Sequence, residues 1–387
     1  MEERIDKDEV PMQHLKHSLE RARTAGARTG RALAGPLRTR YPGFLFGLPL
    51  PAGEVPIFNY HEVTRAELET DLAYLRENGY ATLCLDEFVR AARSRRRRRA
   101  VLLTFDDAWS SFWTVAYPLL REYRMRAELF APTHWVDGNG PAGMFMTWDQ
   151  VRECAASGFV EVESHAFRHA LVHTSSQLAG FASPATRAAT HFFNWPMRDG
   201  DGAAALGPPP VGTPIHHALP LLSATRRYVE STAAVRACRR LVEARGAAFF
   251  DSPAADTQLR ACYDAANERH PGRWASEDEL ERERRREFDV SRERFCAELG
   301  YAPRYFAFPW MLGNDRSLEL AARQGLEAVF GVGVDFRAAR RPGLPVPVYG
   351  RYKSDWLRCL PGKGRVHALP VLAGKLRHLG TPDSLAH

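Results

Sequence analysis

The sequence predicts an α/β fold built on a parallel sheet or barrel. Short apolar segments typical of strands alternate with segments whose apolar residues recur at helical spacing. The clearest strands are "AVLLTF" (100–105), "AELFAP" (127–132) and "FVEVES" (159–164). Because the chain has 387 residues and 45% hydrophobic content, it can bury one large α/β core.

Each further element follows from its local pattern. "VPIFNYHEV" (55–63) is typical of a first strand, and 65–80 predicts a helix that ends at Asn78-Gly79, a common C-cap pair. The same criteria predict helices at 110–124, 148–157, 277–299 and 316–324, and strands at 304–309 and 327–333. In such an alternation catalytic groups gather at the carboxyl ends of the strands.

The alternation stops between His173 and about Ser276. We expect an insertion at 176–276 that acts as a lid or specificity segment, although a peripheral helical decoration without substrate contact fits the same pattern. The expected organisation is a basic extension (1–50), a catalytic domain (51–360) that holds this insertion, and a C-terminal tail (361–387).

Composition excludes several classes of protein. The chain has no apolar stretch near the roughly 20 residues of a membrane span, and its first fifty residues show no basic-then-apolar signal peptide. The six cysteines form no CxxC pair, which argues against a zinc knuckle and a disulfide framework. We therefore expect a cytoplasmic protein.

The net charge of +7 comes largely from one run, "RSRRRRR" at 93–99. Such a run suits peripheral contact with an anionic membrane at its inner face, or it is a solvated loop between a helix and a strand. No aromatic residues interleave it, as base stacking requires, so no nucleic acid partner is expected.

Acidic and imidazole side chains follow two of the predicted strands. Asp106 and Asp107 end the strand at 100–105, and His165 and His169 follow the strand at 159–164. If the histidine segment is helical, both imidazoles share one face, because residues four apart are neighbours on a helix. A carboxylate and two histidines form a common metal site that leaves a position open for water. Alternatively, Asp107 is only the N-cap of the next helix.

Three motifs in this order resemble the polysaccharide deacetylase family, also called the NodB-homology family or carbohydrate esterase family 4. They are "TFDD" (104–107), "SHAFRH" (164–169) and "RYFAFPW" (304–310), and the opening "IFNYHEV" is similar to the exopolysaccharide-deacetylase branch. The likeness covers about 55–175 and 277–335. It implies a distorted, incomplete (β/α)7 barrel with a large insertion.

The resemblance also implies roles for individual residues. Asp106 would be the general base, and Asp107, His165 and His169 would bind a divalent metal, with Zn²⁺ preferred and Co²⁺ or Ni²⁺ as alternatives. The backbone N–H of Trp310, beside the proline of the third motif, would help to hold the developing oxyanion. Two adjacent carboxylates would then serve two separate purposes.

The chain departs from the family pattern in three places. Ala307 replaces an arginine that tunes the base, which leaves the partner of the base unassigned, and Ala166 replaces a hydroxyl residue. The Leu-x-His motif that supplies the general acid is missing from 343–356. His61, at the end of the first strand, is our candidate for that acid, with His173 as the weaker choice.

The sequence therefore predicts a metal-dependent hydrolase that removes the N-acetyl group from an N-acetylated sugar in a glycan or glycan precursor, including a lipid-linked one. A deformylase or another non-sugar amide hydrolase would use the same metal site. A non-catalytic saccharide-binding protein is the third interpretation, but a binding protein needs no general base.

Overall fold

The computed structural model describes residues 42–93, 99–199, 204–331, 343–367 and 371. The chain divides into two compact units, which we describe separately. The inserted unit comprises Ala170–Arg284, and the barrel unit comprises the described residues before and after it. Most of the basic extension, the core of the arginine run (94–98) and most of the C-terminal tail lie outside the described residues.

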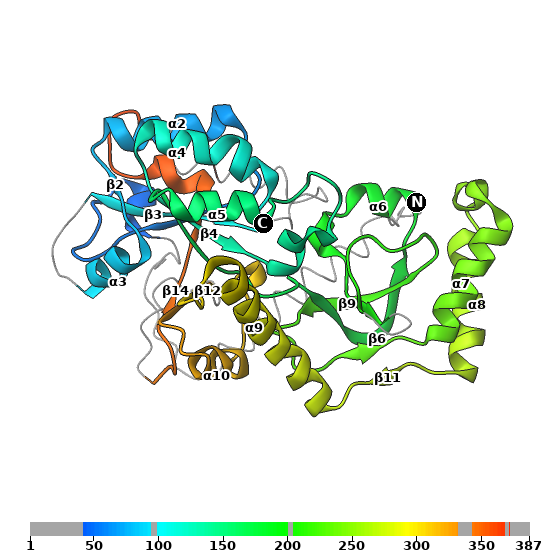
Figure 1. Cartoon of the computed structure of the whole chain (residues 1–387). Helices are drawn as coiled ribbons and strands as arrows, with labels where there is room; N and C mark the ends of the chain where they lie inside the picture. The colour runs from blue at the N-terminus through cyan, green and yellow to red at the C-terminus, as the bar shows by residue number, and fades with distance from the viewer. Residues whose placement is uncertain (1–41, 94–98, 200–203, 332–342, 368–370, 372–387) are drawn as a thin grey trace, which may run out of the picture. The chain divides into compact units, whose positions relative to one another are not determined.

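The barrel unit is built on a sheet whose strand pairs are all parallel. Its order is β14-β13-β12-β5-β4-β3-β1-β15, with β2 beside β3 (Figure 1). The strands are β1 Ile57–Tyr60, β2 Ala81–Thr82, β3 Ala100–Asp106, β4 Ala127–Ala131, β5 Val160–Ser164, β12 Tyr305–Ala307, β13 Ala328–Phe330, β14 Val348–Tyr349 and β15 Tyr352–Lys353.

The barrel is closed by a strand that is interrupted in its middle. β14 pairs with β13 at one edge of the sheet and β15 pairs with β1 at the other edge, yet only Gly350 and Arg351 separate them in the chain. Because three residue steps span at most about 10 Å, the two edges must lie close together. β14 and β15 therefore act as two halves of a seventh strand, and the expected distorted, incomplete (β/α)7 barrel is confirmed.

Helices cover the sheet, and the sequence pattern predicts all of the α-helices given below except α3. Leu68, Leu72 and Leu75, spaced along one face of α2, are fully buried in one core cluster with Val101 and Leu103 of β3. The helix expected at 110–124 is helical from 110 to 123, with a π-helical turn at Phe112–Ala116 that leads directly into α4. The helices of this part of the chain are α2 Arg65–Glu77, α3 Leu85–Arg93, α4 Tyr117–Tyr123, α5 Trp148–Ala156, α9 Glu277–Leu299 and α10 Asp315–Arg323.

The inserted unit contains an antiparallel strand pair that the sequence pattern does not predict. β6 (Leu171–Phe181) pairs antiparallel with β9 (Pro214–Pro220), and α7 (Thr232–Arg245) packs on α8 (Ala255–Arg269) (Figure 1). The polar run of β6 and the prolines that bound β9 hide the strand signal, although β9 alternates buried and half-buried residues. Its shorter elements are α6 Pro184–Ala189, β7 Arg198–Asp199, β8 Ala204–Ala205, β10 Tyr228–Val229 and β11 Arg273–Trp274.

The apolar run at 43–50 belongs in part to the protein core. Phe44 and Leu45 are buried in a short 3-10 turn, whereas Leu48 is 60% exposed. In the part of the chain that the structure describes, no helix is both long and apolar enough to cross a bilayer. Contact with an anionic membrane stays a prediction from the sequence.

The interior of the barrel holds a buried acidic residue, Glu128 on β4. Glu128 alternates with outward-facing Leu129 along β4, so it shares the inner face with Phe130. It is fully buried, and its register partner on β5 is Glu161. Burial raises the pKa of Glu128 well above its usual range, and the neighbouring Glu161 raises it further. The folded barrel therefore favours a protonated Glu128.

Glu128→Gln should reduce the loss of stability at rising pH. A carboxyl whose folded pKa is raised stabilises the fold at low pH, and this contribution is lost as pH rises from the unfolded pKa through the folded one. Above about pH 5, the free energy of unfolding of the wild type should fall by up to about 1.4 kcal/mol per pH unit more than that of the variant. Urea unfolding at several pH values measures this difference; exposed Glu153→Gln is the control, and parallel curves for Glu128→Gln and wild type would refute it.

Candidate active site

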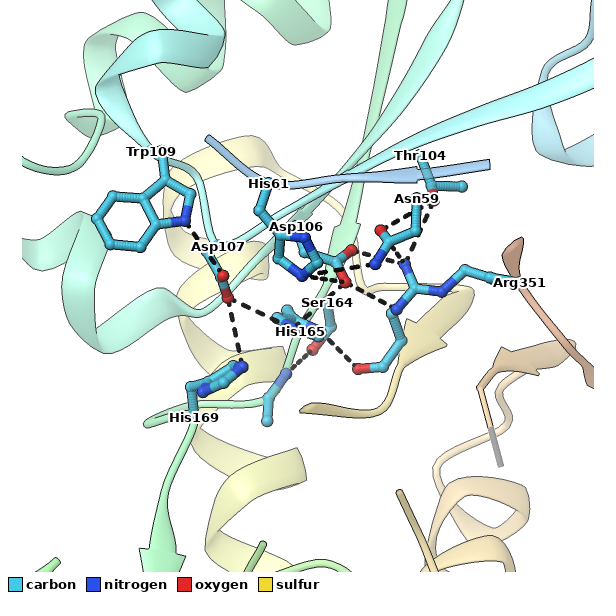
Figure 2. A network of polar contacts seen from close by, with 12 residues as sticks. Asn59, His61, Thr104, Asp106, Asp107, Trp109, Ser164, His165, His169 and Arg351 are labelled. Carbon is cyan, nitrogen blue, oxygen red and sulfur yellow. Dashed lines mark hydrogen bonds and ion pairs between the residues drawn. The ribbon is translucent and has the colours of Figure 1, made fainter. Parts of the chain in front are cut away.

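The two aspartates of the first motif point in different directions because the backbone turns sharply between them. Asp106 is the last residue of β3, and Asp107 and Ala108 both have left-handed conformations, with φ of 73° and 52°. The N–H of Asp107 donates to the carbonyl of Phe130 at 3.1 Å, which ties this turn to β4. Both carboxylates are buried, and each meets a different set of side chains (Figure 2).

Asp106 is paired with Arg351, a residue that sequence reasoning missed. Two guanidinium nitrogens of Arg351 donate to the two carboxylate oxygens at 2.7 Å each. Arg351 is 2% exposed and also donates to Asn59 Oδ1 at 3.0 Å and Thr104 Oγ1 at 3.3 Å. It therefore supplies the partner that the alanine at position 307 cannot. The available signal was an arginine between two short β segments, Val348–Tyr349 and Tyr352–Lys353.

Asp107, His165 and His169 form a group that could hold a metal ion. Asp107 Oδ1 lies 3.5 Å from His165 Nε2 and 3.4 Å from His169 Nε2. Bonds of about 2.1 Å at tetrahedral angles place ligand atoms about 3.4 Å apart, so these separations fit zinc. Among the described residues, Asp107 Oδ1 and His165 Nε2 are buried without a hydrogen-bond partner. The group therefore has the donor set and the spacing of a metal site.

Neighbouring groups orient two of these ligands. His165 Nδ1 lies 2.8 Å from the carbonyl of Ala307, and since a carbonyl only accepts, Nδ1 carries the hydrogen. The neutral ring then presents its Nε2 lone pair to the metal group. Burial lowers the pKa of His165, which favours that neutral ring. Trp109 Nε1 donates to Asp107 Oδ2 at 3.2 Å, so this carboxylate does not cap the next helix.

The helix that would place both histidines on one face does not form. Residues 165–169 form an irregular turn after β5, in which Ala166 (φ 69°) and His169 (φ 50°) are left-handed. The imidazoles nevertheless converge, and their ring centroids lie 4.9 Å apart. Four-residue spacing thus indicated the correct pair for the wrong geometric reason.

The other two predicted site residues lie at the same ends of the strands. His61 follows β1, and its Nε2 is 3.9 Å from Asp106 Oδ2. Burial lowers the pKa of His61 well below its usual range, and the charge of Arg351 lowers it further. Trp310 follows β12 in the turn Pro309–Met311, with its ring 4.1 Å from that of His169. Their roles as acid and as oxyanion donor stay predictions.

His173, the weaker candidate for the acid, lies on β6 of the inserted unit. It is 3% exposed, and its Nδ1 is 4.0 Å from Glu230 Oε2. Burial lowers the pKa of His173 well below its usual range, with nearby His216 as the next cause. These contacts describe a histidine packed inside its own unit.

Comparison with known families agrees with this geometry. Residues 93–188 match the model of the polysaccharide deacetylase family. This segment of the chain is similar to a polysaccharide deacetylase domain. The matched segment contains both aspartates and both histidines of the site, whereas His61, Trp310 and Arg351 lie outside it.

Similar proteins share only part of this chain. Over 119 residues it is 34% identical to the poly-beta-1,6-N-acetyl-D-glucosamine N-deacetylase of Escherichia coli K12, covering 27% of this chain and 18% of that protein. It is 29% identical over 126 residues to the putative polysaccharide deacetylase YxkH of Bacillus subtilis 168, covering 30% and 43%. The chain thus matches less than half the length of these relatives. A solved de-N-acetylase from Aggregatibacter actinomycetemcomitans is 20% identical, covering 77% and 93%, with a TM-score of 0.48.

Arg351→Met should destabilise the barrel unit by about 3 to 5 kcal/mol, because it leaves the buried Asp106 carboxylate without its cation. Denaturant unfolding at neutral pH measures this loss. Arg304→Met is the matched control, since Arg304 pairs with Asp86 and Glu327 at the surface and should cost under about 1 kcal/mol. Equal losses in the two variants would contradict a special role for the buried pair.

Proposed function

We propose that this chain is a metal-dependent N-deacetylase that acts on an N-acetylated saccharide. One observation carries the proposal: a separate carboxylate, Asp106, lies beside three buried side chains with the spacing of metal ligands, 3.7 Å from His165 Nε2. A set of metal ligands alone is compatible with a structural or ligand-binding metal site, whereas a general base beside it is what a hydrolase needs. The similarity to a polysaccharide deacetylase domain agrees with this interpretation.

Asp107, His165 and His169 would hold the divalent metal, with Zn²⁺ preferred because the donor set is one carboxylate oxygen and two imidazole nitrogens. When bound, such a cation polarises a carbonyl and makes water more acidic. Asp106 would take the proton from the attacking water. Since both of its oxygens accept hydrogen bonds from Arg351, the ionised form that a base requires is favoured.

The departing amine needs a proton, and His61 is the proposed donor. Its Nε2 is on the same side of the site as Asp106 Oδ2, at 3.9 Å. Asn59 Nδ2 lies 3.5 Å from the same nitrogen, and the Asn59 oxygen accepts from Arg351, so the Asn59 NH₂ group donates to Nε2 and the resting neutral ring carries its hydrogen on Nδ1. His61 would therefore first gain the proton that Asp106 takes from water and then pass it to the amine. The Asn59 contact positions the ring at the mouth of the site. The backbone N–H of Trp310 would stabilise the oxyanion.

The substrate class is proposed from the relatives and the chemistry together. The Escherichia coli relative is named for poly-beta-1,6-N-acetyl-D-glucosamine, so N-acetylated hexosamine polymers and their precursors, soluble or lipid-linked, are the first substrates to test. A formamide or another non-sugar amide would meet the same catalytic groups, and only substrate testing separates these classes. A cytoplasmic location with contact at the inner membrane face remains a prediction from the sequence.

Asp106→Asn should lower acetate release from N-acetylated oligosaccharides by about 10² to 10⁴-fold while leaving metal content unchanged, because it removes the base and keeps the three ligands. Asp107→Asn is the matched variant and should lose metal and activity together. Acetate assays and metal analysis on the purified full chain check both. Acetate release that survives in Asp106→Asn would refute the mechanism, and stoichiometric metal without turnover of any amide would favour a saccharide-binding protein.

His61→Gln should slow amide hydrolysis by about 10²-fold or more but should leave hydrolysis of an aryl acetate ester nearly unchanged. An amine leaves only when it is protonated, whereas a nitrophenolate leaves as an anion. The measurement is kcat for both substrates with the same zinc-loaded preparation. Equal slowing on amide and ester would show that His61 does not act as the acid.

A further inference from the structure

The turn that carries both histidines is conformationally costly. Ala166 and His169 are non-glycine residues with positive φ, and each costs of order 1 kcal/mol unless surrounding contacts impose it. Those contacts begin with the loop after β4. The N–H groups of Thr133 and His134 donate to the carbonyls of Ala166 and Phe167, at 3.3 and 2.9 Å. Backbone pairing therefore holds the first half of the turn.

Side chains hold the second half, next to His169. The Arg168 N–H donates to Glu287 Oε2 at 2.8 Å, and Arg168 Nε donates to Glu287 Oε1 at 2.7 Å. On the other side of the same residue, Trp135 Nε1 donates to the Arg168 carbonyl at 2.9 Å. Glu287 thus accepts hydrogen bonds from both the main chain and the side chain of Arg168, which immediately precedes His169, a predicted metal ligand.

A second contact from the same helix reaches the other end of the turn. Ser291 lies four residues after Glu287 on α9, so both face the same side of the helix. Ser291 Oγ is 2.8 Å from Ser164 Oγ, which also accepts from the Ala166 N–H at 3.2 Å. Glu287 and Ser291 therefore bracket the segment 164–168 from one face of α9.

The burial of the Arg168–Glu287 pair argues for a positioning purpose. Arg168 is 4% exposed and Glu287 is 1% exposed. Removing two charges from water costs several kcal/mol, and apolar residues of similar size often serve stability equally well or better. What apolar residues cannot supply is an acceptor for the Arg168 N–H. The pair therefore fixes the conformation of the turn more than it adds to the free energy of unfolding.

We propose that Glu287 is a positioning residue for the three predicted metal ligands. By accepting hydrogen bonds from Arg168, it holds the turn in a conformation in which His165 and His169 face Asp107 before the ion binds. The proposal rests on the metal site of the proposed function, and it adds α9, which lies outside the three sequence motifs, to the determinants of metal affinity. Ser291 supports the same turn from one helical turn further along.

Two near-isosteric double variants separate the effect of the hydrogen bond from the residue 168 N–H from the effect of the Arg168–Glu287 ion pair. The Met-Met variant, Arg168→Met with Glu287→Met, removes the ion pair and the acceptor. The Met-Gln variant, Arg168→Met with Glu287→Gln, removes the ion pair but keeps an oxygen that can accept from the residue 168 N–H. Arg294→Met is the control, because it removes an α9 ion pair, with Asp137, that does not touch the histidine turn. Metal-free full-length proteins would be titrated with Zn²⁺ against a chromogenic chelator and with Co²⁺ by visible absorption.

The Met-Met variant should bind Zn²⁺ at least about tenfold more weakly than wild type, and its Co²⁺ spectrum should change in intensity. The Met-Gln variant and Arg294→Met should stay within about threefold of wild type and keep its Co²⁺ spectrum. Circular dichroism identifies folded samples. If the Met-Met variant does not fold, Ser291→Ala replaces it, with an expected weakening of about fivefold or more, which lies outside the threefold range of the control.

Wild-type affinity in a folded Met-Met variant overturns the proposal. A Met-Gln variant that binds Zn²⁺ as weakly as the Met-Met variant also overturns it, because the ion pair, and not the hydrogen bond from the residue 168 N–H, would then determine the affinity. If Ser291→Ala is needed and leaves affinity unchanged, the proposal also fails. A wild-type chain that takes up no Zn²⁺ or Co²⁺ would instead refute the metal site of the proposed function, so the two failures are distinguishable.

Discussion

The buried pair of Asp106 and Arg351 is the interaction on which the rest of the site depends. Asp106 ends β3, and Arg351 interrupts the strand that bridges the two edges of the barrel. The carboxylate is therefore neutralised only when the barrel has closed, and closure in turn buries a guanidinium that needs a partner. Closure of the barrel and pairing of the proposed base therefore depend on the same residue, Arg351.

Adjacent carboxylates can serve different purposes because a left-handed turn separates their surroundings. Asp106 receives two hydrogen bonds from a cation, whereas Asp107 receives one from the Trp109 indole and keeps Oδ1 directed at two imidazoles. Burial, with the charge of Asp106 as the next cause, raises the pKa of Asp107 well above its usual range. An ion bound among these ligands would reverse that preference, since it favours the charged carboxylate.

Histidine placement shows how the scaffold supplies geometry that local sequence does not encode. The turn at 165–169 is irregular, and contacts from the loop after β4 and from α9 hold it. Helical spacing suggested the correct pair of residues, but propensity carried no information about the positive φ values of Ala166 and His169. The absent hydroxyl at position 166 is offset by Ser164, whose Oγ accepts from the Ala166 N–H.

By itself the sequence determined the parallel α/β barrel, the carboxyl-terminal strand positions of Asp106, Asp107 and His165, and the resemblance to polysaccharide deacetylases, because strand periodicity and short motifs can be identified without the fold. Only the tertiary structure decided which cation faces Asp106, how the barrel closes, and that β6 pairs with β9. Arg351 lies 245 residues from Asp106 in the chain, and such a pairing depends on strand order and on the interrupted seventh strand, neither of which a local pattern contains.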